Sequence, residues 1–169
     1  MKQKKVYLFC GPPASGKSTW IQRNLKPGAI WISRDFIRFS IVNENEDYFS
    51  HETEVFKNFI DQINYNLINS DIDIIYIDAT HINKKSRNKT LNLLNKNYIS
   101  ELNCICFTTP KEVCLERNSL RKGRSRVPDS AIYNMFKNYR YPNKDEEFFN
   151  HLYLVNENGS MCEIEGGGF

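Results

Sequence analysis

The sequence of 169 residues predicts an α/β domain in which a mainly parallel, five-stranded sheet lies between two layers of helices. Three observations predict this fold class. Short apolar segments alternate with helix-like segments along the chain, which is typical of parallel sheets with right-handed crossovers. The apolar segments are almost continuous, as in strands that helices cover on both faces. A glycine-rich turn separates the first strand from the first helix.

Five segments rich in β-branched and aromatic residues predict strands at 5–10, 29–33, 73–78, 103–109 and 151–156. The segments between them predict helices at 17–25, 34–41, 47–70, 83–98, 110–122 and 128–139. In the longest helix, Phe56, Ile60, Ile63 and Leu67 recur at spacings of four, three and four. This spacing places the four side chains on one face of an amphipathic helix.

Residues 1–156 are expected to form a single domain, within which residues 111–127 form a helical lid. Residues 157–169 are polar and then glycine-rich, so the sequence predicts either a frayed tail or a short hairpin. The longest apolar runs are far shorter than the roughly 20 residues that a membrane span needs. The basic N-terminus leads into an apolar stretch that is too short for a secretion signal. We therefore expect a cytoplasmic protein that does not contact membranes.

The cysteine pattern does not indicate a metal site. The five cysteines are Cys10, Cys104, Cys106, Cys114 and Cys162, without a paired C-x-x-C spacing, and the three histidines are scattered. A structural zinc site would need four ligands at suitable spacings. The pattern therefore favours buried, reduced thiols.

The glycine-rich turn, "GPPASGKS" at residues 11–18, matches the phosphate-binding pattern G-x-x-x-x-G-K-[ST]. In this pattern, backbone N–H groups surround a β-phosphate and the following helix directs its positive end toward it. The residues expected to contact ATP here are Gly11, Ala14, Ser15, Gly16, Lys17, Ser18 and Thr19. Lys17 would bridge the β- and γ-phosphates, and Ser18 would bind Mg²⁺. The motif predicts the P-loop NTPase fold.

Acidic residues follow two other predicted strands. Asp78 ends the third strand, where a carboxylate can hold Mg²⁺, although a helix cap is an alternative role. After the second strand, Asp35 and Arg38 stand three residues apart and share a helix face. At the carboxyl edge of the sheet, Asp35 can accept a proton from a hydroxyl group and Arg38 can hold an anionic group. An N-cap aspartate with a surface ion pair is the simpler interpretation.

The segment "RNSLRKGRSR", residues 117–126, carries five basic residues without an acid between them. Such a run is often a solvated face. Because the run lies beside a glycine in the middle of the chain, a flap that faces an anion is the alternative interpretation. A guanidinium in such a flap can meet two phosphate oxygens at once.

The segments "GPPASGKSTW", "SRDFIR", "DATHIN" and "RNSLRKG…VP" resemble, in order and spacing, the kinase domain of bacteriophage-type polynucleotide 5′-kinases. The likeness covers roughly residues 5–140. The phosphate loop is shared by many ATPases, whereas Arg-Asp-x-x-Arg followed by Arg-Asn-Ser before a basic flap is more specific. Two positions depart from the family pattern: His81 stands where asparagine is frequent, and Phe36 stands where a second acid is frequent.

The resemblance implies transfer of the γ-phosphate of ATP, with Mg²⁺, to the 5′-hydroxyl end of DNA or RNA. It implies that Asp35 is the general base and that Arg38 holds the 3′-phosphate of the terminal nucleotide. It further implies that Arg121, on the lid helix, stabilises the transferring group and that Arg117 assists one turn earlier.

Two other classes of function remain open from the sequence. A small-molecule kinase on the same fold, acting on a nucleoside, sugar, antibiotic or zeta-toxin-like substrate, would keep Lys17, Ser18 and Asp35 but would give Arg38 no 3′-phosphate to hold. A nucleotide-dependent switch would need Lys17 and could dispense with both Asp35 and Arg38.

Overall fold

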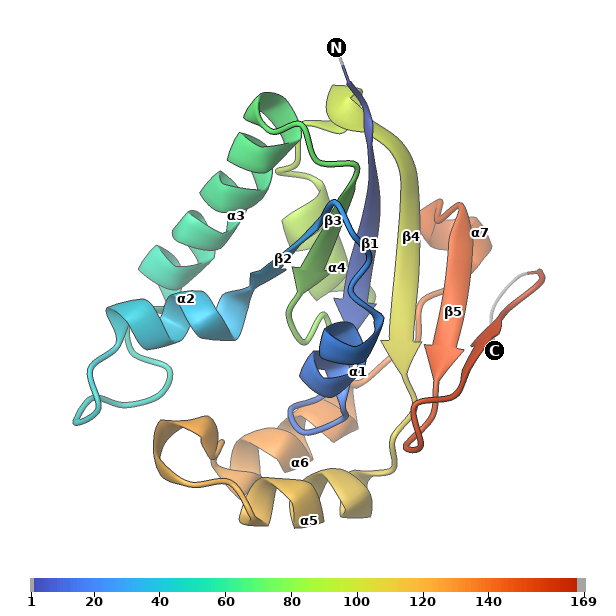
Figure 1. Cartoon of the computed structure of the whole chain (residues 1–169). Coiled ribbons are helices and arrows are strands. Elements are labelled where there is room, and N and C mark those ends of the chain that lie inside the picture. The colour runs from blue at the N-terminus through green and yellow to red at the C-terminus, as the bar shows by residue number, and fades with distance from the viewer. Residues whose placement is uncertain (1, 167–169) are drawn as a thin grey trace.

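The computed structural model describes residues 2–166, in which six strands form one sheet of order β2-β3-β1-β4-β5-β6 (Figure 1). The strands are β1 (Lys4–Cys10), β2 (Ala29–Ser33), β3 (Ile74–Asp78), β4 (Ile99–Phe107), β5 (His151–Val155) and β6 (Met161–Glu163). The first five strands are parallel to one another, and β6 is antiparallel to β5. The predicted α/β class with a mainly parallel sheet is therefore confirmed.

The predicted number of strands is corrected from five to six, because the segment after β5 forms a hairpin. The Asn156 side chain accepts hydrogen bonds from the backbone N–H groups of Asn158 and Ser160, both at 3.0 Å, which closes the turn. Ile164 N then donates to Leu152 O at 2.8 Å. Of the predicted tail, residues 167–169 lie outside the described part of the chain.

The helices are α1 (Lys17–Asn24), α2 (Arg34–Ile41), α3 (Glu52–Asn69), α4 (Lys84–Leu91), α5 (Lys111–Ser119), α6 (Asp129–Asn138) and α7 (Lys144–Glu147). Two 3₁₀ turns are formed by Lys96–Tyr98 and Gly123–Ser125. The helix predicted to begin at residue 47 begins at Glu52, because His51 has a left-handed φ of 60° and Ser50 N bonds Asp47 O in a turn. The helix predicted for 83–98 ends at Leu91.

Two apolar clusters are built from alternate residues of the same strands. Val6, Leu8 and Cys10 of β1 belong to a cluster with Phe59 and other residues of α3, together with Leu91 of α4. The intervening Phe9 belongs to a second cluster with Ile21 of α1 and Tyr76 of β3. Because side chains alternate along a strand, these clusters lie on opposite faces of the sheet. Figure 1 shows α1 in front of the sheet and α4 behind it.

The core also accounts for the cysteines. Cys10, Cys104, Cys106 and Cys114 are buried free thiols, as expected. The expectation of burial is wrong for Cys162, which lies exposed on the short edge strand β6. Within residues 2–166, none of the helices combines the length and the apolar character that crossing a membrane requires.

Candidate active site

The loop between β1 and α1 has the geometry of an anion-binding turn. Gly16 forms the N-cap of α1 with a φ of 102°, a left-handed conformation that glycine adopts without strain. No side chain caps this end of α1, so its first backbone N–H groups stay available to a ligand. Helix ends of this kind bind phosphate, because the N–H groups and the helix dipole both favour a negative charge.

Lys17, the first residue of α1, directs its ammonium group back across this loop. Its Nζ donates hydrogen bonds to the carbonyl oxygens of Gly11 at 2.7 Å and Pro12 at 3.0 Å. Desolvation lowers the pKa of Lys17, the carboxylates of Asp78 and Asp35 oppose this effect, and the guanidinium of Arg121 adds to it. Three of the predicted site residues thus lie close enough to act on the charge of Lys17.

Asp78 reaches the same place from the end of β3. The sheet register pairs it with Phe9 of β1 and Ser33 of β2. Its side chain is buried, and its Oδ2 accepts a hydrogen bond of 3.1 Å from Trp31 Nε1. Burial raises the pKa of Asp78 to about 6, against the opposing charge of Lys17. The Asp78 carboxyl group is therefore fixed by Trp31 beside the phosphate loop.

The polar residues after Asp78 have structural roles, because their hydrogen-bond partners lie within the protein. Asn83 caps α4 through a complete capping box, so Asp78 is not needed as a cap. His81 is buried, its Nδ1–H donates to Phe9 O at 2.8 Å, and its Nε2 accepts from the Thr90 hydroxyl at 3.0 Å. Burial lowers the pKa of His81 to about 3, so the ring is neutral at physiological pH. His81 supports the loop from beneath.

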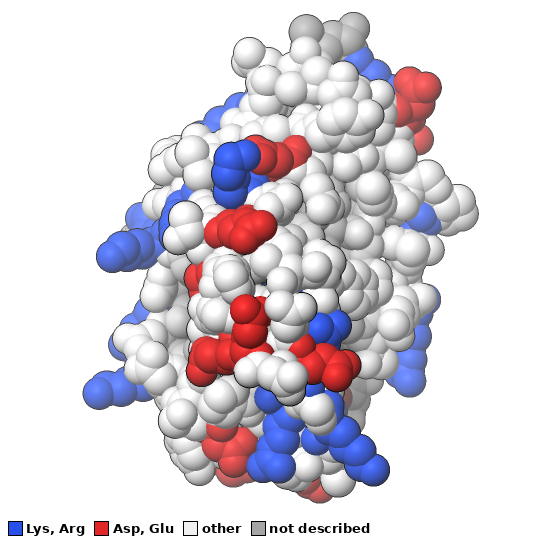
Figure 2. Space-filling view, turned by 90° about the vertical axis from the view of Figure 1, so that its left-hand side faces the viewer, with Lys and Arg blue, Asp and Glu red and all other residues white. Residues whose placement is uncertain are grey.

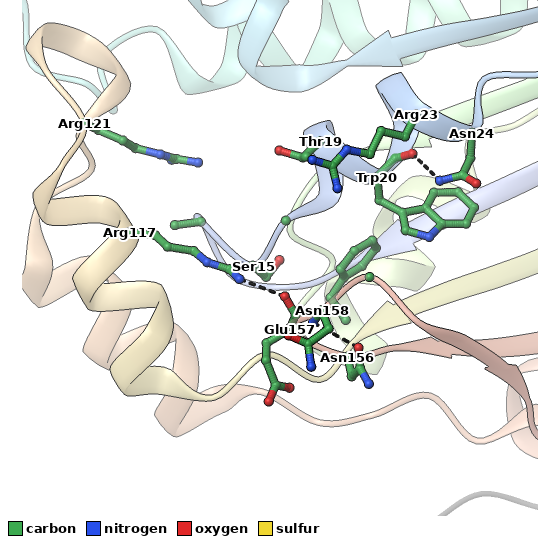
Figure 3. Close-up of a pocket in the computed structure, with 14 residues that line it drawn as sticks. Ser15, Thr19, Trp20, Arg23, Asn24, Arg117, Arg121, Asn156, Glu157 and Asn158 are labelled. Carbon is green, nitrogen blue, oxygen red and sulfur yellow. Dashed lines mark hydrogen bonds between the residues drawn. The ribbon is translucent and has the colours of Figure 1, made fainter.

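A pocket of about 460 Å³ adjoins the phosphate loop (Figure 3). Its walls include Trp20 and Arg23 of α1, Arg117 and Arg121 of the lid segment, and the β5–β6 turn at residues 156–159. Arg117 NH2 donates a hydrogen bond of 2.8 Å to Glu157 O, which joins the lid to this turn. The pocket places an aromatic ring and several cations next to the loop, a setting that suits a nucleotide.

The position of Arg121 differs from the expectation that it lies on the lid helix one turn after Arg117. The predicted helix 110–122 ends at Ser119, so Arg121 lies beyond α5. The chain turns there because the buried Asn118 side chain bonds both backbone groups of Val127, donating to its O at 2.7 Å and accepting from its N at 3.1 Å. Both arginines nevertheless point into the pocket (Figure 3).

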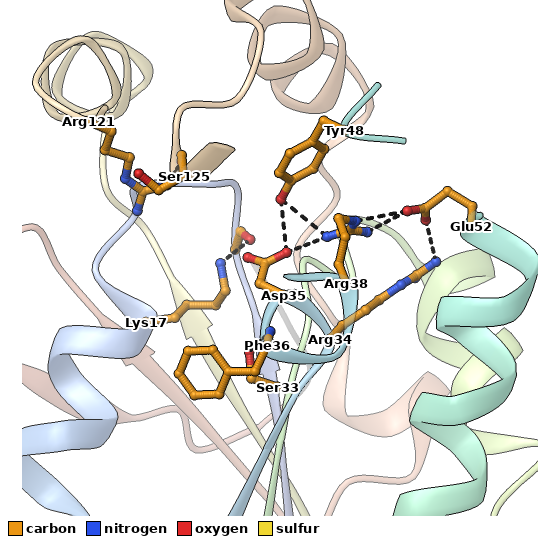
Figure 4. Close-up of polar contacts among 11 residues, drawn as sticks. Lys17, Ser33, Arg34, Asp35, Phe36, Arg38, Tyr48, Glu52, Arg121 and Ser125 are labelled. Carbon is orange, nitrogen blue, oxygen red and sulfur yellow. Dashed lines mark hydrogen bonds and ion pairs between the residues drawn. The ribbon is translucent and has the colours of Figure 1, made fainter. Parts of the chain in front are cut away.

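Asp35 lies in the first turn of α2, where its charge suits the positive end of the helix. Ser33 forms the N-cap and accepts from Phe36 N at 3.4 Å. Asp35 is exposed toward a cavity of about 140 Å³, which Lys17 also lines, and Figure 4 shows the two charged groups near one another. The neighbouring Phe36 ring lies at the surface, with its centroid 4.8 Å from that of Trp31.

A network of hydrogen bonds surrounds Arg38, whose side chain is only 7% exposed. Its NH1 donates to Asp35 Oδ1, and its Nε and NH2 donate to Glu52 Oε1 at 2.9 and 2.7 Å. Arg34 NH2 donates to the other oxygen of Glu52 at 2.8 Å. The Tyr48 hydroxyl donates to Asp35 Oδ1 at 2.9 Å (Figure 4). Arg38 is thus held between two carboxylates.

A second groove, of about 690 Å³, shares Arg38 and Tyr48 with the Asp35 cavity. One wall is the cationic lid segment, with Lys122, Arg124 and Arg126, and the other is the loop between α2 and α3, with Glu44 and Glu46. Figure 2 shows this division of charge, with acidic side chains gathered above basic ones on the lower part of the face. The groove and the Asp35 cavity therefore adjoin at Arg38 and Tyr48.

The sequence did not indicate four features of this site: Tyr48, Glu52, Trp31 and the β5–β6 turn. Tyr48 and Glu52 reach Asp35 and Arg38 across a loop, without a fixed spacing that could have signalled the contact. Trp31 could have been suspected, because it precedes Ser33 by two residues and so lies on the same side of β2.

The fold and this site define a P-loop kinase-like domain. The AAA domain family AAA_33 matches residues 6–142, most of the chain, and the protein belongs to that family.

Solved structures extend the comparison. A chain in the Pnkp1/Rnl/Hen1 RNA repair complex superposes with a TM-score of 0.68 at 20% identity, over 96% of this protein and 49% of that chain. This protein thus spans about half the length of that neighbour. A sugar kinase from Janibacter sp. HTCC2649 gives a TM-score of 0.62 at 13% identity, covering 93% and 87%. A fungal RNA kinase gives 0.61 at 12% identity, covering 98% and 79%. At these identities the likenesses show the fold alone.

Proposed function

We propose that this protein is an ATP-dependent kinase that transfers the γ-phosphate of ATP to the 5′-hydroxyl end of a polynucleotide. One observation carries the proposal: the Asp35 carboxylate is exposed to a cavity that Lys17 also lines, and this cavity shares Arg38 and Tyr48 with the groove along the lid. A general base must lie within reach of both the attacking hydroxyl and the phosphate that the loop would hold.

The chemistry needs little covalent work from the protein. Asp35 takes the proton of the hydroxyl as its oxygen forms a bond to the γ-phosphorus, and the bond from this phosphorus to the β–γ bridging oxygen breaks. Lys17 and Arg121 supply positive charge where the equatorial oxygens gain negative charge. Arg117 joins the lid to the β5–β6 turn and so helps to enclose the nucleotide.

The residues present fit ATP and Mg²⁺. In the described part of the chain, no group of three or more Asp, Glu, His or Cys side chains could hold a metal ion. Mg²⁺ is commonly bound through one or two protein oxygens together with substrate phosphates and waters. Ser18, exposed on the first turn of α1, and the buried carboxylate of Asp78 would hold it, directly or through a water. When bound, the ion neutralises phosphate charge.

The groove supports a polynucleotide as the acceptor. Its lid wall offers three cations to a phosphate backbone, and Arg38 lies where the groove meets the Asp35 cavity. Glu52 holds the Arg38 guanidinium in place at this junction. Arg38 would there contact the phosphate 3′ to the reacting nucleotide. The RNA repair and RNA kinase structures among the fold neighbours agree with this acceptor class.

A small-molecule kinase is the second candidate, and a specific observation favours it. Arg38 is already paired with Asp35 and Glu52, and the opposite groove wall carries Glu44 and Glu46, which repel phosphate. A neutral or cationic alcohol would meet no such repulsion. The sugar kinase among the fold neighbours agrees with this alternative.

Three acceptors distinguish the candidates: a 5′-hydroxyl oligonucleotide, a nucleoside 3′-monophosphate and a plain nucleoside, each incubated with γ-labelled ATP and Mg²⁺. Labelling of the first two without the third supports the polynucleotide kinase. Labelling restricted to plain alcohols, in a panel that includes sugars, supports the small-molecule kinase. Release of phosphate without any labelled acceptor would indicate a nucleotide-dependent switch.

A further inference from the structure

We propose that Tyr48 is a positioning residue for the transfer: its hydroxyl group fixes the Asp35 carboxylate so that Oδ2 takes the proton of the acceptor, and its ring supports Arg38. The inference rests on the proposed role of Asp35 as the general base. It adds a residue from a loop that carries no recognisable motif.

The hydrogen bonds at Asp35 distinguish its two oxygens. Oδ1 accepts from the Tyr48 hydroxyl at 2.9 Å and from Arg38 NH1, whereas no residue in the described range 2–166 donates to Oδ2. Arg38 NH1 also donates to the Tyr48 oxygen at 3.2 Å. Two donors that are bonded to one another therefore hold the carboxylate at a single oxygen, and the other oxygen is left to act as a base.

The phenol is suited to act as a donor. Burial raises the pKa of Tyr48 well above its usual value, and the Asp35 charge raises it further, so the hydroxyl keeps its proton throughout the physiological range. The ring makes edge-to-face contacts with Phe39 and Phe49, at centroid distances of 6.4 and 4.8 Å. The Arg38 guanidinium carbon lies 4.6 Å from the Tyr48 ring centroid, a cation–π contact.

Tyr48 also lies where the acceptor must pass. It lines both the groove between the lid and the α2–α3 loop and the cavity that holds Asp35 and Lys17. An acceptor that fills this junction would contact the Tyr48 ring, whose hydroxyl group is hydrogen-bonded to Asp35. Removal of the hydroxyl alone should therefore affect catalysis, and removal of the whole ring should also affect acceptor binding through Arg38.

The test measures kcat and the KM of each substrate for Tyr48→Phe and Tyr48→Ala, with a 5′-hydroxyl oligonucleotide as acceptor. Tyr48→Phe is expected to lower kcat about tenfold and to leave both KM values within twofold of wild type. Tyr48→Ala is expected to lose as much in kcat and to raise the acceptor KM severalfold. Tyr65→Phe, an exposed tyrosine on α3, is the control for loss of a phenol, and thermal melting checks that each variant is folded.

Other outcomes overturn the proposal in distinguishable ways. A wild-type kcat for Tyr48→Phe, when Asp35→Asn is inactive, would remove Tyr48 and leave the proposed function standing. If both variants raise the acceptor KM and keep the wild-type kcat, Tyr48 only packs the loop and does not position Asp35. If the wild type labels no oligonucleotide, or if Asp35→Asn transfers at the wild-type rate, the proposed function fails and Tyr48 loses its role with it.

Discussion

Glu52 Oε1 accepts two hydrogen bonds from Arg38, at 2.9 Å from Nε and 2.7 Å from NH2, while Glu52 Oε2 accepts one from Arg34. One carboxylate at the start of α3 thus balances two guanidinium groups on α2. Arg38 is almost fully buried, so the loss of this partner would leave its charge with Asp35 as the only anionic contact among the described residues. Glu52 therefore contributes both to the stability of the fold and to the orientation of the Arg38 side chain.

Glu52→Gln should lower the free energy of unfolding by about 1–3 kcal/mol, because breaking a buried ion pair leaves an uncompensated charge and Glu52 is itself partly solvated. The acceptor KM should also rise, because Arg38 loses its fixed direction. Urea denaturation and steady-state transfer measure the two effects. Glu54→Gln, an exposed position on the same helix, should change neither. Equal stability of Glu52→Gln and wild type would contradict this account of the network.

Arg121 lies close enough to Lys17 to lower its pKa, and its weak 3.4 Å contact with Ser125 O leaves the guanidinium free to meet a ligand. Arg121→Ala should lower kcat roughly 10²–10³-fold, as the loss of a preorganised charge at a transferring phosphate does. The KM for ATP should change little. Lys111→Ala, at the start of the same lid segment, serves as the control, and rapid-quench measurement of single turnovers reports the chemical step. A drop confined to ATP affinity would assign Arg121 to ground-state binding.

The parts of the site that follow local patterns could be predicted from the sequence. The phosphate loop, the start of α2 at Arg34 and the aspartate at the end of β3 each depend on residues adjacent in the chain. Parallel strands then bring their carboxyl ends to one edge, which is why Lys17, Asp35 and Asp78 could be expected together.

The remaining parts depend on contacts between distant segments. His81 could not be assigned to the core from "DATHIN", because its partners Phe9 and Thr90 come from other elements. The strand β6 has only three residues, all exposed, so no apolar alternation marks it. The pairing of Arg38 with Glu52 depends on where a loop of irregular conformation places the first turn of α3.

Asp78 gives a pH dependence with a defined sign. Burial disfavours the charged carboxylate and raises the pKa of Asp78 from 3.8 to about 6 in the folded protein. Between these values the folded state keeps a proton that the unfolded state has released, so each rise in pH favours unfolding. The wild type should therefore lose stability relative to Asp78→Asn by about 1–3 kcal/mol between pH 4 and pH 7 without Mg²⁺.

Chemical denaturation of both proteins at the two pH values measures this difference, because contributions from other titrating groups cancel between them. Asp78→Asn should also lose transfer activity, since a neutral amide is a poor ligand for Mg²⁺. A stability difference that is independent of pH would show that the pKa of Asp78 is the same in the folded and unfolded states. A difference of opposite sign would mean that Lys17 outweighs burial.

Gly11 tests how closely the phosphate loop is packed. A Cβ added there would lie 2.7 Å from Ser15 Oγ and 2.9 Å from Phe107 Cβ. The Phe107 Cβ is bonded directly to the backbone of β4 and its side chain is buried, so this atom cannot move aside. Gly11→Ala should therefore displace the loop, with a loss of about 1–3 kcal/mol in stability and at least tenfold in ATP affinity. Gly123→Ala is the matched control, because its Cβ would meet no atom within 4 Å and only the φ of 58° is strained. That variant should lose about 1 kcal/mol and bind ATP normally in a calorimetric titration. Normal ATP binding by Gly11→Ala would mean that the loop accommodates a methyl group at the point where β1 ends.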